Sequence, residues 1–412
     1  MEIQRLSIGL PPVALDAHKI TFLVTSLLRL KVQHLQFSID DLNYLNTSCV
    51  LPRGFSASYS LSKLKLNLGG YTLYISNAIQ FPSLKTLDLS YATFANDESV
   101  EEFFAGCPLL EELTLNNCYW LYIKQITIAI STLRILTISF DPNCLRRCVD
   151  CEKFSVKIDA VNLLSLTYAS DPTIRFVIVN PPTSMVDAYI ALSSLFPQDQ
   201  QCAEYVSHCA NVLLSGLASV KSLELSEDTF MEPKPEYEYE YEYEYEYEYE
   251  YEYEDEDEDE DEPEPPFVDD HFHLLPEFHN LTHLCLDLDT KVFTRKSIMQ
   301  FLLRCPKLEV LVFPLGHNTF KDNHDWTLIP LPCCFKSSLK KLHITKFDGF
   351  ECEIQFVKFF LENATVLEEF QVSLSRSVHS KYYPENLADL KNQFVGMANC
   401  DILRFDHPNM CD

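Results

Sequence analysis

The sequence has 412 residues, 47% of them hydrophobic, and a formal net charge of −29 at pH 7. Only 9 residues are glycine, which argues against glycine-rich loops that cradle phosphate groups. Residues 232–266 hold 20 of the 61 acidic residues and one of the 32 basic ones, so 41 acidic and 31 basic residues remain elsewhere. A remainder of −10 is an ordinary protein surface, and direct binding of nucleic acid is not expected.

The cysteine content and the N-terminal sequence indicate the compartment. The 15 cysteines are odd in number, and no secretory leader pattern is present at the start. The apolar run at residues 20–28 is far shorter than the roughly 20 residues that a membrane-spanning helix requires. We therefore expect an intracellular protein, in the cytoplasm, the nucleus or both, with no membrane partner.

The stretch CPLLEELTLNNC at residues 107–118 contains a leucine pattern that recurs along the chain. Its leucines Leu110, Leu113 and Leu115 match L-x-x-L-x-L-x-N, the signature of leucine-rich repeats. The first apolar position of each such unit lies at Ile3, Val32, Leu61, Leu84, Leu110, Leu133, Leu163, Val220, Leu281, Leu308, Leu339 and Leu367. The pattern predicts an α/β solenoid, a horseshoe with a parallel concave sheet and helices on the convex side.

Two intervals between units are long, at 57 and 61 residues. The second contains the acidic segment 232–266, and removing these 35 residues leaves a normal interval of 26. The first interval equals about two repeats, but its middle unit cannot be placed from the pattern. Residues 174–179, IRFVIV, are predicted to form a strand, and residues 186–217 are predicted to be mainly helical.

Several units carry helix signals between their strands. Ser99 and Glu102 fit a capping box, residues 294–305 form a second amphipathic helix, and prolines before the next strand end such helices. From Leu339 onward the chain is predicted to form a strand, a turn, a long apolar helix and another strand. An amphipathic segment near residues 387–394 and a strand at residues 402–405 complete a C-terminal cap.

Strand alternation identifies a candidate protein-binding surface. Because the leucines point into the core, the residues between them face the concave side. These residues are Lys63, Lys65, Asn67, Thr86, Asp88, Ser90, Glu112, Thr114, Asn116, His283, Cys285, Asp287, Lys341, His343, Thr345, Glu369 and Gln371. The alternative is a solvated sheet face without a ligand.

Two groups of residues contain the cysteine and histidine side chains that bind metals. Cys144, Cys148 and Cys151 have the C-x-x-x-C-x-x-C spacing of cluster-binding radical enzymes, but no glycine-rich cofactor segment follows. His271, His273, His279, His283 and Cys285 match no zinc spacing. With no phosphate-loop, dinucleotide, zincin or nucleophile-elbow motif present either, no metal, cofactor or catalytic residue is predicted.

The acidic segment alternates Glu and Tyr from Glu236 to Glu254 and then Asp and Glu to Glu262. Repulsion among its carboxylates favours disorder at neutral pH. It is interpreted as a simple-sequence expansion tolerated in a surface loop. Binding of basic partners such as histone tails, and tyrosine phosphorylation, are the alternatives.

The chain resembles plant F-box/leucine-rich-repeat proteins with a C-terminal FBD domain. The likeness rests on the segments FPSLKTLDLSYATF (81–94), CPLLEELTLNNC (107–118), VKIDAVNLLSLTY (156–168), CPKLEVL (305–311), SSLKKLHITKFDGFECEIQFVKFFLENATVLEEF (337–370) and ANCDILRFD (398–406). The resemblance implies that the repeats select a protein for ubiquitination. The Skp1-docking F-box of that family is not recognisable before the first unit, so binding to Skp1 is not expected of this sequence.

These inferences give a domain plan and a function. Residues 1–231 and 267–330 are predicted to be repeats, residues 232–266 a disordered insertion, and residues 331–412 an FBD-like cap. The predicted function is non-catalytic recognition of an unidentified protein, as in the substrate-binding arm of a ubiquitin ligase. The alternative is an independent acidic scaffold that binds histones or other basic proteins.

Overall fold

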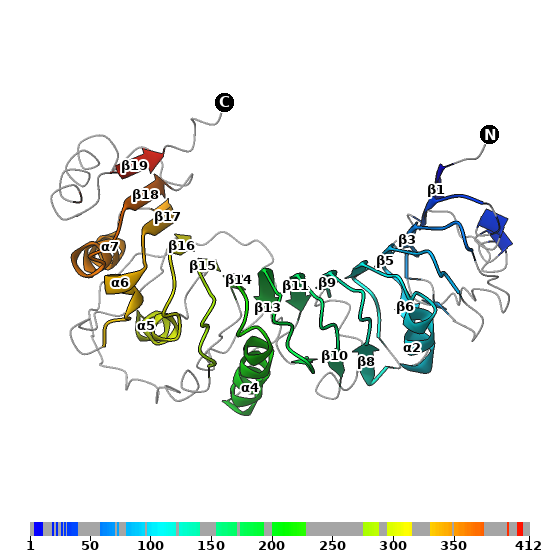
Figure 1. Ribbon diagram of the computed structural model, residues 1–412, viewed down its shortest axis with the longest axis horizontal. Coiled ribbons are helices and arrows are strands. Elements are labelled where there is room, and N and C mark those ends of the chain that lie inside the picture. The colour runs from blue at the N-terminus through cyan, green and yellow to red at the C-terminus, as the bar shows by residue number, and fades with distance from the viewer. Residues whose placement is uncertain are drawn as a thin grey trace, which may run out of the picture.

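In a computed structural model, the chain forms one long curved array of strands (Figure 1). The structure describes residues 4–10, 31–39, 58–70, 72–73, 80–94, 97–120, 123–140, 154–170, 174–192, 200–227, 275–287, 295–314, 330–347, 350–374, 394 and 402–406, with residues 19, 22, 23, 26, 27 and 29.

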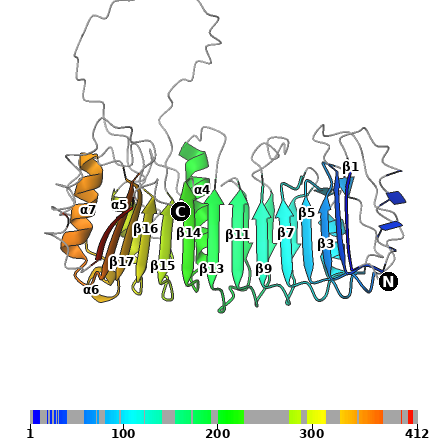
Figure 2. The same cartoon turned by 90° about the horizontal axis from the view of Figure 1, so that it is seen from above.

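The main sheet has 14 strands, and every adjacent pair in it is parallel. Its strands, in spatial order, are β1 (Arg5–Leu10), β2 (His34–Ile39), β3 (Lys63–Asn67), β5 (Thr86–Ser90), β7 (Glu112–Asn116), β9 (Ile135–Ser139), β11 (Ser165–Ser170), β13 (Asp187–Leu192), β14 (Ser222–Glu227), β15 (His283–Asp287), β16 (Val310–Pro314), β17 (Lys341–Phe347), β18 (Glu369–Leu374) and β19 (Ile402–Asp406). The strands lie side by side along the whole molecule (Figure 2).

The repeated leucines form the core by stacking between strands of equal register. Leu87 pairs with Leu113, and Leu89 pairs with Leu115 on the next strand. All four side chains are 0% exposed. Each repeat buries its apolar face only against its neighbours, which is why the array grows lengthwise instead of dividing into domains.

A recurring turn brings the chain into each strand. The backbone N–H of Leu110 donates to the carbonyl of Cys107 at 3.2 Å, and the N–H of Leu308 donates to that of Cys305 at 3.3 Å. Two consecutive N–H groups then donate to one carbonyl of the preceding repeat, as Glu111 and Glu112 do to Lys85 at 2.8 and 2.9 Å. The turn thereby fixes the register between neighbouring strands.

The convex side carries helices and two small sheets (Figure 1). The helices are α2 (Asp97–Ala105), α4 (Gln200–Gly216), α5 (Arg295–Leu303), α6 (Cys334–Ser337) and α7 (Glu351–Asn363). One small sheet has the order β12 (Arg175–Ile178), β10 (Ser155–Ile158) and β8 (Gln125–Ile128), and the other pairs β4 (Thr72–Leu73) with β6 (Thr93–Phe94). None of the helices that the structure describes is long and apolar enough to cross a membrane.

An aromatic cluster lies where the main sheet meets the three-stranded one. The Trp120 ring stacks on Phe94 with centroids 4.7 Å apart and on Phe154 at 6.0 Å, and it meets the edge of Phe140 at 5.9 Å. Trp120 is 2% exposed. These rings join the end of β6 to the segments that follow β7 and β9 and precede β10.

The sequence prediction for residues 186–217 was wrong in its first part. These residues begin with strand β13, and helix α4 starts only at Gln200. Ala188 occupies the position that leucine holds in other units, so the signature is lost although Ala188, Ile190 and Leu192 are buried. The predicted strand at 174–179 exists as β12, but it belongs to the three-stranded convex sheet and not to the missing unit.

Other predictions agree with the structure. Helices α2 and α5 lie where they were expected, the C-terminal part runs β17, α7, β18, and β19 covers residues 402–405. Strand β14 pairs directly with β15, although residues 232–266 separate them in sequence. The acidic segment itself, the Ser99 side chain and most of residues 387–394 lie outside the described residues.

Replacing Leu113 by alanine tests the stacked core. We expect the free energy of unfolding to fall by about 2–5 kcal/mol, because a fully buried side chain would leave a cavity. The neighbouring Thr114→Ala, on the concave face, should change it by less than about 1 kcal/mol. Urea unfolding followed by circular dichroism measures both, and equal losses would contradict the assignment of the two faces.

Candidate protein-binding face

Alternate positions of the strands place rows of side chains on the concave side of the main sheet. The first described row runs Arg5, His34, Lys63, Thr86, Glu112, Ile135, Ser165, Asp187, Ser222, His283, Val310, Lys341 and Glu369. The second runs Ser7, Gln36, Lys65, Asp88, Thr114, Thr137, Thr167, Tyr189, Glu224, Cys285, Val312, His343 and Gln371. The helices lie on the other side of the sheet (Figure 1).

Strands β3, β5 and β7 bring the first nine predicted residues into one contiguous block. Lys65 Nζ lies 2.7 Å from Asp88 Oδ2, and Ser90 Oγ donates to Asp88 Oδ1 at 3.2 Å. Thr86 Oγ1 donates to Glu112 Oε2 at 3.2 Å. The carboxylates of the block therefore already have partners on the same face, and Ser90 is only 7% exposed.

The predicted residues of the second half are less contiguous. Lys341 Nζ lies 2.9 Å from Glu369 Oε2, and His343 Nε2 lies 4.0 Å from Glu369 Oε1. Strand β16 separates β15 from β17 and places Val310 and Val312 between the two groups. The backbone of Asp287 pairs with Ser226, but its side chain is outside the described residues.

The middle of the face was missed by the sequence analysis. Ile135 on β9 is 42% exposed and Tyr189 on β13 is 36% exposed, although both types are usually covered. Asp187 accepts a hydrogen bond from Ser165 on the adjacent strand. The repeat register would have identified Ile135, whereas Tyr189 lay in the unit that could not be placed.

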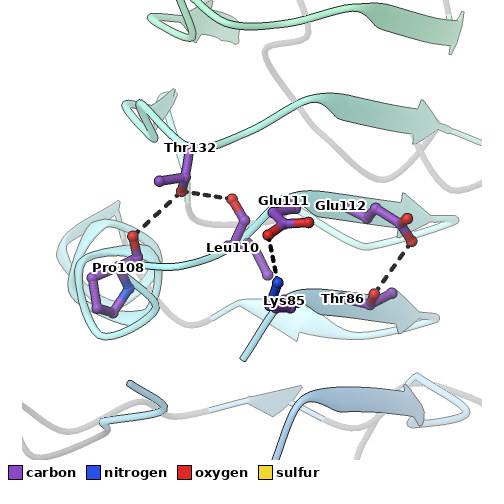
Figure 3. Close-up of polar contacts among 7 residues, drawn as sticks. All are labelled: Lys85, Thr86, Pro108, Leu110, Glu111, Glu112 and Thr132. Carbon is purple, nitrogen blue, oxygen red and sulfur yellow. Dashed lines mark hydrogen bonds and ion pairs between the residues drawn. The ribbon is translucent and has the colours of Figure 1, made fainter. Parts of the chain in front are cut away.

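A separate set of polar contacts lines the edge where the chain enters the strands (Figure 3). Lys85 Nζ lies 2.8 Å from Glu111 Oε1, and this hydrogen bond and the lysine charge lower the pKa of Glu111. Thr132 Oγ1 donates to the carbonyls of Leu110 at 2.7 Å and Pro108 at 3.3 Å. These contacts join one repeat to the next and satisfy turn carbonyls, so their role is structural.

Buried thiols also recur at equivalent positions. Cys107 Sγ donates to the carbonyl of Phe103 and Cys305 Sγ to that of Phe301, each at 3.4 Å, at the end of an outer helix. Burial raises the pKa of Cys107 from 9.0 to about 12 and that of Cys305 well above 9.0. Both remain neutral thiols at physiological pH and act as small apolar core residues.

No metal centre is found in the part of the chain that the structure describes, where no three His, Cys, Asp or Glu side chains are grouped to hold an ion. Cys144, Cys148, Cys151, His271 and His273 lie outside it. His279 lies 3.4 Å from Glu277, and His283 Nδ1 lies 2.9 Å from the hydroxyl of Thr282.

Comparison with known proteins identifies two regions. Residues 329–372 match the FBD family model, and residues 22–177 match the model described as "FBD-associated F-box protein At5g56370, LRR repeats". Among similar proteins of Arabidopsis thaliana, FBD-associated F-box protein At5g22730 is 24% identical over 88% of this chain and 72% of its own length. F-box/LRR-repeat protein 13 is 27% identical over 86% of this chain and 69% of its own length.

Thiol labelling tests the burial of Cys107, Cys305 and Cys334. At pH 8 we expect iodoacetamide to modify exposed Cys333 and to leave Cys107, Cys305 and Cys334 unmodified until urea is added. Burial raises the pKa of Cys334 to about 12 as well. These thiols have a pKa near 9.0 in the unfolded chain, whereas burial raises the pKa of Cys107 and Cys334 to about 12 in the folded chain. The free energy of unfolding should therefore fall as the pH rises above about 9, because the unfolded chain then loses protons that the folded chain keeps. Site-resolved mass spectrometry measures the labelling, and rapid native modification of Cys107 would contradict its assignment to the core.

Proposed function

We propose that this chain is a non-catalytic protein-recognition module, because residues 22–177 match the model of FBD-associated leucine-rich repeats and residues 329–372 match the FBD model. In this role it resembles the substrate-binding arm of a Skp1-cullin-F-box ubiquitin ligase, which selects the protein to be ubiquitinated. The name of F-box/LRR-repeat protein 13 combines an F-box with leucine-rich repeats, and the name of At5g22730 combines an F-box with FBD; these names support the class.

The single observation that carries the proposal is the concave face. Parallel strands present rows of side chains over the length of the array, and the described helices all lie on the opposite side (Figure 1). Curved solenoids use such extended surfaces to bind other proteins. A folded or extended protein segment would be held by several repeats at once.

The chemistry of the face suits protein binding. Its centre exposes Ile135 and Tyr189 among Ser and Thr side chains, while ion pairs such as Lys65 with Asp88 lie toward the ends. A large exposed side chain can insert into a partner and lose its water, which gives most of the binding free energy at interfaces. The surrounding hydroxyl groups supply hydrogen bonds without long flexible side chains.

The 17 predicted residues from Lys63 to Gln371 remain proposed contacts. To them we add Ile135, Thr137, Thr167 and Tyr189, which continue the same rows across β9, β11 and β13. We propose that the ligand is a protein of the same cell compartment, in the cytoplasm or the nucleus.

Substituting Thr114 by arginine tests whether the concave face binds the ligand. A long cationic side chain within the second row should reduce recovery of the bound protein at least about tenfold, since interface contacts are lost and a charge is buried. Thr127→Arg on β8 is the matched control, because Thr127 is similarly half-buried but lies on the convex three-stranded sheet.

Affinity capture with quantitative mass spectrometry, in plant cells treated with a proteasome inhibitor, measures both variants. The proposal predicts that Thr114→Arg alone loses the captured set. If Thr127→Arg loses it equally while both variants remain folded, the concave face is not the recognition surface.

The alternative function assigns binding to the acidic segment 232–266, which carries 20 acidic residues. Since β14 and β15 pair directly, we expect the chain without residues 232–266 to keep its fold. Recognition by the concave face predicts an unchanged set of bound proteins. A loss confined to histones and other basic proteins would favour the acidic-scaffold function.

A further inference from the structure

Three basic side chains occupy consecutive positions of the first concave row, at the β1 end of the sheet. Arg5 on β1 pairs in register with His34 on β2, and His34 pairs with Lys63 on β3. Adjacent strands are about 4.8 Å apart, so the three side chains leave the sheet next to one another. We call these three residues the cationic row.

The cationic row differs from the other lysines of the face. Lys65 is paired with Asp88 at 2.7 Å, and Lys341 is paired with Glu369 at 2.9 Å. Within the described part of the chain, Arg5, His34 and Lys63 have no ion pair or hydrogen bond through their side chains. The charges of Arg5 and Lys63 are two strands apart, and no described carboxylate neutralises either of them, so both are available to an anion.

The surroundings of the row offer hydrogen-bond donors and no free described carboxylate. Ser7 and Gln36 are exposed beside it in the second row. Asp88, the first acidic residue of that row, is already bound to Lys65. Glu112, in the first row, stands two strands beyond Lys63, about 10 Å away.

We propose that the cationic row binds a phosphoryl group on a segment of the protein ligand. The inference rests on the proposed function, because it assigns a chemistry to one end of the same concave face. A phosphoryl group carries nearly two negative charges and three acceptor oxygens. It can therefore accept hydrogen bonds from neighbouring side chains about 4.8 Å apart, two in parallel from the planar Arg5 guanidinium and one from the ring N–H of His34, while Lys63 supplies a second positive charge.

A run of acidic residues fits the row less well. In an extended peptide lying across the strands, side chains on one face are spaced by about 6.6 Å, twice the rise per residue. Each carboxylate of such a run brings one charge and two acceptor oxygens to a separate point along the peptide. A phosphoryl group brings nearly two charges and three acceptor oxygens to a single point within reach of all three side chains, and this favours phosphorylation over a run of Asp or Glu.

A fluorescence anisotropy experiment on the full chain tests the proposal. The probe is a labelled pool of short peptides with a fixed central phosphoserine and mixed residues elsewhere, compared with the same pool carrying serine and with a pool carrying two adjacent glutamates. We expect the phosphoserine pool to bind at least about tenfold more tightly than either other pool, because charge-assisted hydrogen bonds are involved. Raising the salt concentration should weaken this binding.

The double variant Arg5→Gln, Lys63→Gln should lose the preference for phosphoserine. Its matched control is Arg175→Gln, Lys307→Gln, which removes the same charge from exposed positions off the concave face, on β12 and in the turn before β16. The control should bind as the unmodified chain does. Thermal melting should show that both variants stay folded, since all four side chains lie on the surface.

Several outcomes would overturn the proposal. Equal binding of the serine and phosphoserine pools would do so, as would equal loss in the control variant or tighter binding of a single-stranded RNA of similar length. If removing residues 232–266 raised phosphoserine binding tenfold or more only when Arg5 and Lys63 are present, the acidic segment of the chain itself would be the ligand. In each case, loss of the captured proteins in Thr114→Arg would still support protein recognition by the concave face. The two proposals can therefore be refuted independently of each other.

Discussion

The in-register stacking of two inward side chains per repeat is the constraint on which the rest of the structure depends. Leu113 and Leu115 lie between Leu87 and Leu89 on one side and Leu136 and Ile138 on the other, all 0% exposed. Because strand side chains alternate, fixing these positions also fixes which residues face the concave side. The entry turn maintains the register by directing two N–H groups to one carbonyl of the preceding repeat. The core and the candidate binding face are therefore two consequences of one register.

The same constraint explains why the convex side varies. A repeat needs only some apolar cover for its inward residues, and this chain uses α2, α4, α5 and α7 in some repeats and strands β8, β10 and β12 in the middle. In that middle region the rings around Trp120 fill the space between the two sheets. Connections can also differ greatly in length, since β14 and β15 pair directly across the segment that contains residues 232–266.

Much of this arrangement could be predicted from the sequence, because leucine spacing reports the register directly. The solenoid, the C-terminal β17–α7–β18 order and the placement of the first nine concave residues all follow from it. Strand β13 could not be predicted, since Ala188 removes the leucine that marks a unit. The convex sheet could not be predicted either, because residues 175–178 have the composition of any buried strand and nothing local says which sheet they join. The register also places Lys341 beside Glu369, but whether their side chains form an ion pair depends on rotamers that the leucine pattern does not give.

The separation of the two faces lets the concave residues change independently of the core. Thr114 is half-buried between the fully buried Leu113 and Leu115, and its side chain points away from theirs, so it can change without disturbing the leucines on which stability depends. On this surface, charges neutralised by a neighbour, as in Lys65 with Asp88, mainly shape the face. Charged side chains without such a neighbour keep their hydrogen-bond donors available to a ligand. Substituting them can change which ligand is bound with little effect on the stability of the fold.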